Sequence, residues 1–276
     1  MTDQVGGLTT RAGIERLDAD PDTETVVVVS KPPEPAAASA VLEAVAACET
    51  PVVVDFLGGD DDAVREAGAT PAATLAEAAS LALGDDAAES DGSARALEPT
   101  VGPDLSVEGD VRGLFTGGTL CAEAALSLSE AIEGLATNVG VGDAVADPLA
   151  PSGDALVDLG ADDLTAGRPH PMIDPTLRDD LLARTLADDA VGVVLLDVVL
   201  GYGAHPDPAV GIVDALADAA DPPPVVASVC GTDADPQSRA SQVAALEDAG
   251  VVVAPSNAAA ARLAARATGV EREAPR

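Results

Sequence analysis

Short apolar runs at intervals along the chain constrain its fold more than any other feature. Each run is rich in β-branched residues and apolar at consecutive positions, the pattern of a strand buried on both faces. Segments with helical spacing separate the runs, and this alternation predicts an α/β fold with doubly wound parallel sheets. The runs are 25–30, 51–59, 111–118, 191–201, 223–231 and 251–257, and the helical segments include 36–48, 119–134, 175–187, 207–220 and 237–249.

The chain contains an internal repeat. Residues 15–35 and residues 183–208 share the same order: helix, acidic turn, apolar strand and proline-containing loop. Two further pairs of segments follow in register, which indicates a duplicated βα unit. These pairs are 51–59 with 223–231, and 66–82 with 248–267.

The repeat predicts a first domain at 1–84 and a second at 111–276. Residues 85–110 between them are acidic and rich in small residues, proline and glycine, and are interpreted as a linker. The second copy opens with a strand and helix at 113–125. Residues 1–14 are too few to supply both, so the first domain is expected to lack its opening strand.

The net charge of the chain excludes some classes of binding partner and indicates the environment in which it folds. Asp and Glu number 48 against 14 Lys and Arg, for a net charge of −34, which repels nucleic acid and anionic membranes. The alternatives are a disordered acidic chain and a folded, salt-adapted (halophilic) protein, and the dense apolar runs favour the latter. Residues 2–25 are polar, and no run approaches the roughly 20 apolar residues of a membrane span. A cytoplasmic protein is expected.

The cysteines give no sign of a metal site. Cys48, Cys121 and Cys230 are odd in number, far apart and outside any CxxC pattern. They are predicted to be reduced and mostly buried.

The segment "GLFTGGTLCAEAA" (113–125) suggests an anion site. Gly117, Gly118 and Thr119 stand between a strand and a helix, where unpaired N–H groups and the positive helix end favour an anion. The alternative is a plain turn that needs glycine for a positive φ. Cys121, one turn into the helix, is either a thiol with a lowered pKa or a buried structural residue.

Two loops after strands carry the candidate catalytic residues. The segment "GYGAHPDP" (201–208) follows the longest apolar run, so Gly201, Gly203 and His205 are expected at the carboxyl edge of a sheet, where ligands bind. His205 is a candidate acid, base or anion ligand. Lys31, the only lysine, occupies the equivalent loop of the first domain and is a candidate for holding a carboxylate or phosphoryl oxygen.

Further polar residues are candidates for substrate binding. His170 and Arg178 belong to the proline-flanked segment 167–178, and Arg178 either binds a carboxylate or phosphate or forms a structural pair with a neighbouring Asp. Thr232 and Asn257 follow the last two strands, where they either bind substrate or cap the next helices.

Several of these motifs together resemble the FdrA family. That family is similar to the ligase domains of succinyl-CoA synthetase and of NDP-forming acyl-CoA synthetases. The resemblance implies two flavodoxin-like subdomains, and larger members carry further N-terminal sequence, which in succinyl-CoA synthetase includes a CoA-binding Rossmann domain. The motifs are "SKPPEP", "GLFTGGTLCAEA", "GRPHPMIDPTLR", "LLDVVLGYGAHPDP", "VASVCGTDADPQ" and "VVVAPSNAAAARLA".

The chain departs from the synthetases at their phosphohistidine. In those enzymes helix N-termini face a histidine in a "GHAGA"-like loop. Here either "REAGA" (65–69) places Glu66 at the histidine position, or the loop is absent between Gly59 and Val64, as the internal repeat favours. No GxGxxG fingerprint and no P-loop occur. Phosphorylation in the synthetase manner is therefore not expected.

Three functions follow. The first is an FdrA-like acyl-CoA synthetase that handles acyl and phosphoryl groups and needs a partner or missing domain. The second is a subunit of a carbamoyltransferase of oxamate or allantoin breakdown, and the third is a non-catalytic interaction module. We expect CoA or carbamoyl phosphate as substrate and not as a resident cofactor, a small anionic metabolite as ligand, and a homo- or hetero-oligomer with a related subunit.

Overall fold

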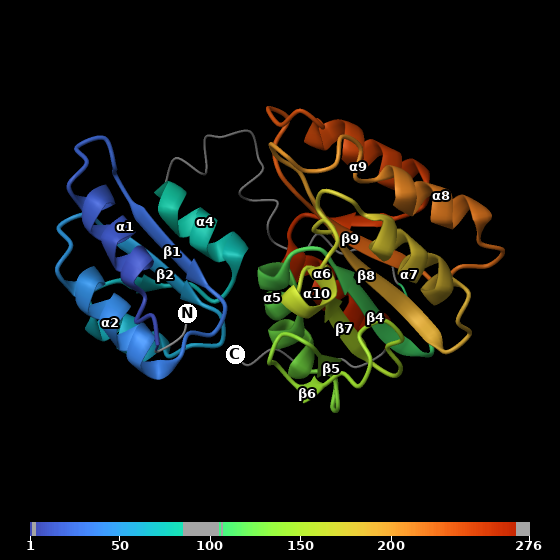
Figure 1. Ribbon diagram of the computed structural model, residues 1–276, viewed down its shortest axis with the longest axis horizontal. Coiled ribbons are helices and arrows are strands. Elements are labelled where there is room, and N and C mark those ends of the chain that lie inside the picture. Colours follow the sequence, from blue (N-terminus) through green and yellow to red (C-terminus); the bar gives the residue numbers. More distant parts are fainter. Residues whose placement is uncertain (2–3, 85–104, 106, 269–276) are drawn as a thin grey trace. The chain divides into compact units, whose positions relative to one another are not determined.

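The chain divides into two compact units, Met1–Arg95 and Ala96–Arg276. The structure, a computed structural model, describes all residues except 2–3, 85–104, 106 and 269–276 (Figure 1). The predicted linker therefore lies almost wholly outside the described residues. Both units are built on parallel sheets flanked by helices, which confirms the predicted fold class.

The second unit has the strand order of a flavodoxin-like sheet. Its main strands run β10-β9-β8-β4-β7, all parallel, so the chain starts in the middle, adds β7 on one side and then crosses to β8 on the other. Two short strands extend the β7 edge. The bounds are β4 Asp110–Phe115, β5 Ala136–Thr137, β6 Asp143–Ala144, β7 Ala155–Asp158, β8 Val191–Val199, β9 Val225–Cys230 and β10 Val252–Ala254.

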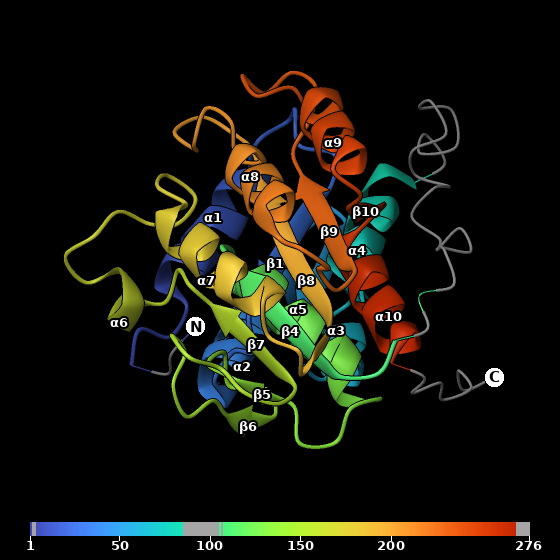
Figure 2. The same ribbon diagram turned by 90° about the vertical axis from the view of Figure 1, so that its right-hand side faces the viewer.

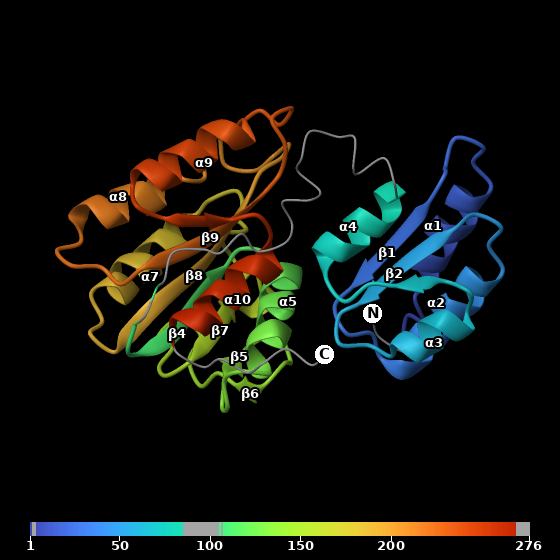
Figure 3. The same ribbon diagram turned by 180° about the vertical axis from the view of Figure 1, so that it is seen from behind.

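Helices cover both faces of this sheet (Figures 2 and 3). Alternate residues of each strand point to opposite faces. Leu195 packs under α5 and α10, and Leu196 packs under the helices of the other face. Both faces are therefore dry, which is why the strands are continuous apolar runs. The helices are α5 Gly118–Ser129, α6 Asp162–Thr165, α7 Thr176–Leu186, α8 Val210–Asp218, α9 Arg239–Asp248 and α10 Asn257–Ala267.

The first unit repeats the second half of the second unit. Its elements follow the order α1-β1-α2-β2-α3-β3-α4, as α7-β8-α8-β9-α9-β10-α10 do, and its sheet has the order β1-β2-β3. The bounds are α1 Leu8–Asp18, β1 Val26–Ser30, α2 Pro35–Ala46, β2 Val52–Phe56, α3 Asp61–Glu66, β3 Thr70–Pro71 and α4 Leu75–Leu83.

The described residues of the first unit lack counterparts of more strands than the sequence predicted. Its described residues contain no counterpart of β4 and α5, as expected, but also none of β5, β6 and β7. The prediction was too narrow because β7, with only four residues ("ALVD"), is too short an apolar run to stand out in an Ala-rich and Val-rich chain. In the described part of the chain, no helix has the length and apolar character needed to span a membrane.

The packing of Leu195 generates a stability prediction. Leu195→Ala removes a side chain with no exposed surface and should lower the free energy of unfolding of the second unit by about 2–5 kcal/mol. Val210→Ala, at a position 40% exposed in α8, should change it by about 0.5 kcal/mol or less. Urea unfolding followed by circular dichroism measures both. Equal losses would contradict a core beneath α5 and α10.

Candidate functional site at the carboxyl edge of the second unit

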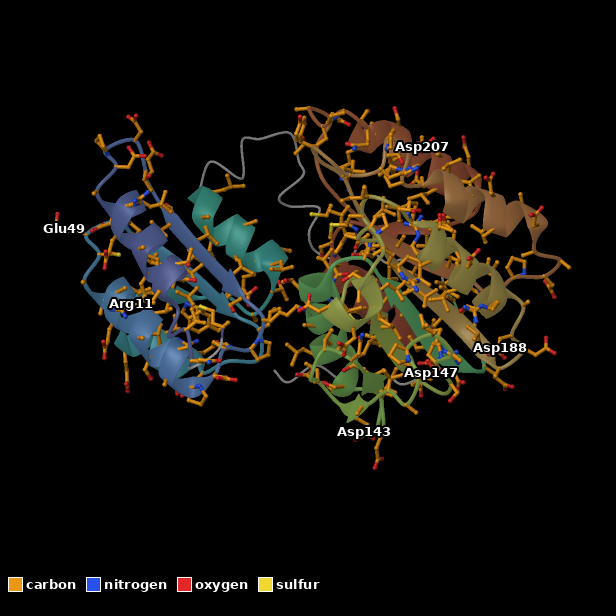
Figure 4. The ribbon with its side chains drawn as sticks, viewed as in Figure 1. Arg11, Glu49, Asp143, Asp147, Asp188 and Asp207 are labelled. Carbon is orange, nitrogen blue, oxygen red and sulfur yellow. The ribbon has the colours of Figure 1, made fainter. Side chains whose placement is uncertain are left out.

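The candidate site lies where the chain order of the sheet reverses, between β4 and β8. In doubly wound folds the loops at this point separate toward opposite faces and leave room for a ligand. Figure 4 labels Asp188 and Asp207, which precede and follow β8 and mark the two ends of this strand. The loops after β4, β7, β8 and β9 belong to the Asp207 end, because all of these strands are parallel.

A buried carboxylate organises the turn between β4 and α5. Asp197 of β8 has no exposed surface. Its Oδ1 accepts from the N–H of Thr116 (2.6 Å) and from the Thr116 hydroxyl (3.1 Å), and its Oδ2 accepts from the N–H of Gly117 (2.7 Å). The chain's own carboxylate therefore occupies the first two N–H groups of the glycine turn.

Burial dominates the titration of this carboxylate. Desolvation raises the pKa of Asp197 from 3.8 to about 6, although the bonds from Thr116 and Gly117 and the charge of Arg178 act in the opposite direction. Sequence reasoning missed Asp197. The available signal was a single acidic residue inside the nine-residue strand "VGVVLLDVV".

The predicted anion-binding residues lie next to this carboxylate. Gly117 is the N-cap of α5 with φ −111°, so the alternative of a turn that needs a positive φ is wrong. A Cβ at Gly117 would lie 3.0 Å from Asp197 Oδ2, which explains the glycine by close approach. Gly118 and Thr119 are the first two residues of α5 and are half-buried. The N–H groups of this first turn have no acceptor within the helix and face the carboxyl edge.

His170 lies against the end of β4. Its Nδ1 accepts from the N–H of Met172 (3.2 Å), and its ring packs on Gly160. A Cβ at Gly160 would overlap His170 Nε2 and lie 3.0 Å from the carbonyl oxygen of Thr116. The glycine after β7 therefore lets the imidazole approach the same turn that Asp197 holds.

Gln237 clamps the loop that carries His205. The loop needs left-handed backbone at Gly201 (φ 139°) and Gly203 (φ 87°). Gln237 Oε1 accepts from the Gly201 N–H (3.2 Å), and its Nε2 donates to the carbonyl oxygens of Gly201 (3.0 Å) and His205 (3.2 Å). Gln237 ends the motif "VASVCGTDADPQ", but sequence reasoning assigned it no role.

The two histidine loops are joined. The N–H of His205 donates to the carbonyl oxygen of Met172 (2.7 Å), two residues after His170. His205 Nδ1 lies 2.8 Å from the carbonyl oxygen of Asp207, so the ring is held by its own loop. Tyr202, at the tip of this loop, is fully exposed (101%). The structure thus gathers Gly117, Gly118, Thr119, Gly201, Gly203 and both histidines at one edge.

A small cavity opens beside His170. It measures about 230 Å³ and includes Arg168, Asp174 and Thr176 in its lining. The hydroxyl and N–H of Thr176 donate to Asp174 and hold the pKa of its carboxyl below the usual value, and the charge of His205 adds to this effect. The cavity is large enough for a small polar ligand.

Arg178 forms the structural pair with a neighbouring Asp, which was one of the two alternatives that the sequence offered. Its side chain is buried, and its guanidinium donates to Asp179 Oδ1 (2.9 and 2.8 Å) and to the carbonyl oxygen of Pro208 (2.9 Å). The residue therefore ties α7 to the end of the His205 loop. Direct binding of substrate by Arg178 would require this pair to open.

Thr232 and Asn257 are not the helix caps that the sequence offered as an alternative. Ser238 caps α9 and Ser256 caps α10. The amide of Asn257 instead donates to the carbonyl oxygen of Leu120 (2.8 Å) and to Glu123 Oε2 (2.7 Å), and the Thr232 N–H and hydroxyl both donate to Asp235 Oδ2 (2.6 and 3.1 Å). Asn257 thereby links the N-termini of α10 and α5.

The predicted lysine lies in the other unit of the chain. Lys31 is exposed directly after β1, in the first unit.

The three cysteines differ in burial. Cys121 is buried in the core, which is the structural alternative, and Cys48 is half-buried. Cys230 is exposed, so the prediction of mostly buried thiols is wrong for this residue. Burial and the charge of Asp197 raise the pKa of the Cys230 thiol. Among the described residues, no group of three or more His, Cys, Asp or Glu could hold a metal ion.

Comparison with known proteins identifies a matching family model and a related sequence. Residues 114–267 match the family model described as CoA-ligase. The chain is also 34% identical over 277 residues to the uncharacterized protein YahF of Escherichia coli (strain K12), a match that covers 93% of this chain and 53% of YahF.

Solved structures show distant similarity in fold. Acetyl-coenzyme A synthetase 1 of Ca. Korarchaeum cryptofilum in its apo form is 16% identical with a TM-score of 0.40, over 94% of this chain and 56% of that chain. ATP citrate lyase of Methanosaeta concilii in complex with (3S)-citryl-CoA is 14% identical with a TM-score of 0.38, over 100% of this chain and 39% of that chain. The chain thus spans about half the length of YahF and of the acetyl-coenzyme A synthetase, and less of the lyase.

The raised pKa of Asp197 predicts a pH effect on stability. Between pH 4 and pH 6 the folded state binds more protons at Asp197 than the unfolded state does, so the contribution of this residue to the free energy of unfolding falls as pH rises through that range. Asp197→Asn does not titrate. The stability of the wild type relative to this variant should therefore fall from about pH 4 to about pH 6 and stay constant above it. Urea unfolding at several pH values measures the difference, and parallel curves would contradict the assignment.

The hydrogen bonds of Gln237 lead to a prediction about hydrogen exchange in the loop after β8. Gln237→Ala removes the acceptor of the Gly201 N–H, and exchange of that amide with deuterium should accelerate by about tenfold. Gln237→Glu keeps this acceptor and serves as the matched control, with a smaller acceleration. Unchanged exchange in the alanine variant would show that the loop is held by other contacts.

Proposed function

Because the chain belongs to the CoA-ligase family, we propose that its second unit binds a small anionic metabolite at the carboxyl edge, as part of an FdrA-like acyl-CoA synthetase. The observation that carries the proposal is the first turn of α5. Its free N–H groups at Gly118 and Thr119 lie at the point where the strand order reverses, beside the loops of both histidines. A partner or a further domain brings CoA and nucleotide.

Asp197 limits where the ligand binds. Its carboxylate takes the N–H groups of Thr116 and Gly117, so the ligand's oxygen atoms meet the next N–H groups, at Gly118 and Thr119. A second negative charge beside Asp197 is unfavourable unless the carboxyl group takes up a proton or a cation accompanies the ligand. The raised pKa of Asp197 makes protonation accessible at mildly acidic pH.

The histidines supply the proton chemistry in this proposal. His205 Nδ1 is engaged by the backbone of Asp207, which leaves Nε2 as the nitrogen for exchange of a proton with a bound acyl or phosphoryl group. His170 Nδ1 instead accepts from the N–H of Met172, and this ring approaches the β4–α5 turn with Nε2. Lys31 belongs to the first unit, and its catalytic role stays a prediction.

Carbamoyl transfer is the second candidate, and a specific observation favours it. The chain has only two histidines, and neither belongs to a "GHAGA"-like loop. Transfer of a carbamoyl group between phosphate and an amide nitrogen needs no phosphohistidine. The same helix N-terminus would then bind the phosphate of carbamoyl phosphate. A non-catalytic module is the remaining alternative.

Isothermal titration in concentrated salt separates these functions. Binding of CoA or succinate supports the synthetase reading, binding of carbamoyl phosphate or oxamate supports the transferase, and heat from none of the four supports the module.

Gly118→Val tests the site itself. The added side chain covers the first turn of α5, and binding of whichever ligand titrates should weaken by at least about tenfold. Gly13→Val is the matched control, because Gly13 lies in α1 of the first unit with no heavy atom within 4 Å of an added Cβ. Undiminished binding by Gly118→Val would rule out the α5 site.

A further inference from the structure

The first unit has an apolar sheet edge that its own described residues leave uncovered. Among the residues that the structure describes, β1 is an edge strand and pairs with β2 alone. Val26 and Val28 point into the core, whereas Val27 and Val29, on the opposite face, are each 42% exposed. An exposed, unpaired and apolar edge strand is a ready template for pairing with another chain.

The second unit shows what covers the equivalent surface. There β4 pairs with β8, and α5 packs beside α10, so that nine of the eleven residues of α10 are buried (Figure 3). In α4, the counterpart of α10, Ala78 alone of the nine residues is buried, and Leu81 and Leu83 are exposed. The surface formed by Val27, Val29, Leu81 and Leu83 is named here the open face.

The turn that precedes the edge strand β1 matches the turn that precedes the interior strand β8 in detail. Asp188 accepts from the N–H of Ala190 (3.0 Å) and its carbonyl oxygen accepts from the N–H of Val191. Asp20 accepts from the N–H of Asp22 (3.1 Å) and its carbonyl oxygen accepts from the N–H of Thr23. The repeat therefore extends to the carboxylates, and Asp20 is the counterpart of Asp188.

The equivalence of Asp20 and Asp188 indicates the charge of a side chain on a strand that would pair with β1. In the second unit the guanidinium of Arg112, in β4, lies 4.0 Å from Asp188 Oδ2. Around Asp20 the turn also carries Asp22 and Glu24, both exposed. A strand that pairs with β1 as β4 pairs with β8 brings its third residue toward this acidic turn, where a basic side chain is favoured.

We propose that the open face and the edge of β1 dock a separate polypeptide. This partner supplies a strand parallel to β1, with a basic residue near its start, followed by a helix rich in small apolar residues that packs against α4. A second copy of this chain cannot supply such a segment, because Leu114 of β4 and Cys121 of α5 are fully buried in its own second unit. The inference does not depend on the proposed ligand site.

A labelled peptide with the sequence of Asp110–Ser129 is the probe, because it is the strand and helix that cover the equivalent surface. Fluorescence anisotropy with the full chain in concentrated salt should show saturable binding. Deuterium exchange should show protection of the Val27 and Val29 amides, which face away from β2, when the peptide is present.

Variants of the full chain localise the binding. Val27→Glu with Val29→Glu places carboxylates on the open face and should weaken binding by at least about tenfold. Val210→Glu is the matched control, because Val210 is similarly exposed (40%) but lies in α8 of the second unit, and it should bind as the wild type does. Val27→Thr with Val29→Thr, which keeps the β-branched shape, provides a second pair if the charged one fails to fold.

A double-mutant cycle tests the charge. Asp20→Asn in the chain and Arg112→Gln in the peptide should each weaken binding, and the two together by less than the product of the single effects. The proposal would be overturned if the peptide showed no saturable binding, or if the Val27/Val29 double variants bound it as tightly as the wild type does. It would also be overturned if this chain formed dimers that the same double variants lose.

Discussion

The arrangement of the candidate site depends on the bonds between Asp197 and the β4–α5 turn. A carboxylate buried in a parallel sheet is costly unless its oxygens accept hydrogen bonds. The N–H groups of Thr116 and Gly117 meet that need. In return, the carboxylate fixes where α5 begins and orients its first turn toward the carboxyl edge. The close approach also favours glycine at position 117, since a Cβ there would lie 3.0 Å from Asp197 Oδ2.

The other loops at this edge are fixed by polar contacts between segments distant in sequence. Gln237 bonds to the backbone of the loop after β8, and that loop bonds through His205 to the backbone of Met172. Asn257 links α10 to α5. Loops that carry glycine, proline and two histidines are thereby held in one arrangement, as a binding site requires.

Among the described residues, the second unit contains an opening half of the repeat and the first unit does not. In the second unit, β4 and α5 bury the face of β8 and nearly all of α10. In the first unit, β1 and α4 keep the same order but leave valines and leucines exposed. The consecutive valines of β1, at 26–29, are suited to burial on both faces, and only one face is buried by the described residues.

Much of the fold followed from the sequence, because continuous apolar runs and helical spacing are local signals of buried parallel strands and their covering helices. The same signals located the glycine turn, His170 and His205. They could not show that Asp197 fills part of that turn, that Gln237 clamps the loop after β8, or that Arg178 donates to the carbonyl oxygen of Pro208. These contacts join residues 30 to 81 positions apart, so they exist only once the sheet has formed. The sequence by itself predicted the parallel strands and the glycine turn that follows one of them, because both are local patterns. The tertiary structure decided which N–H groups of that turn are taken by Asp197, because that contact joins two strands.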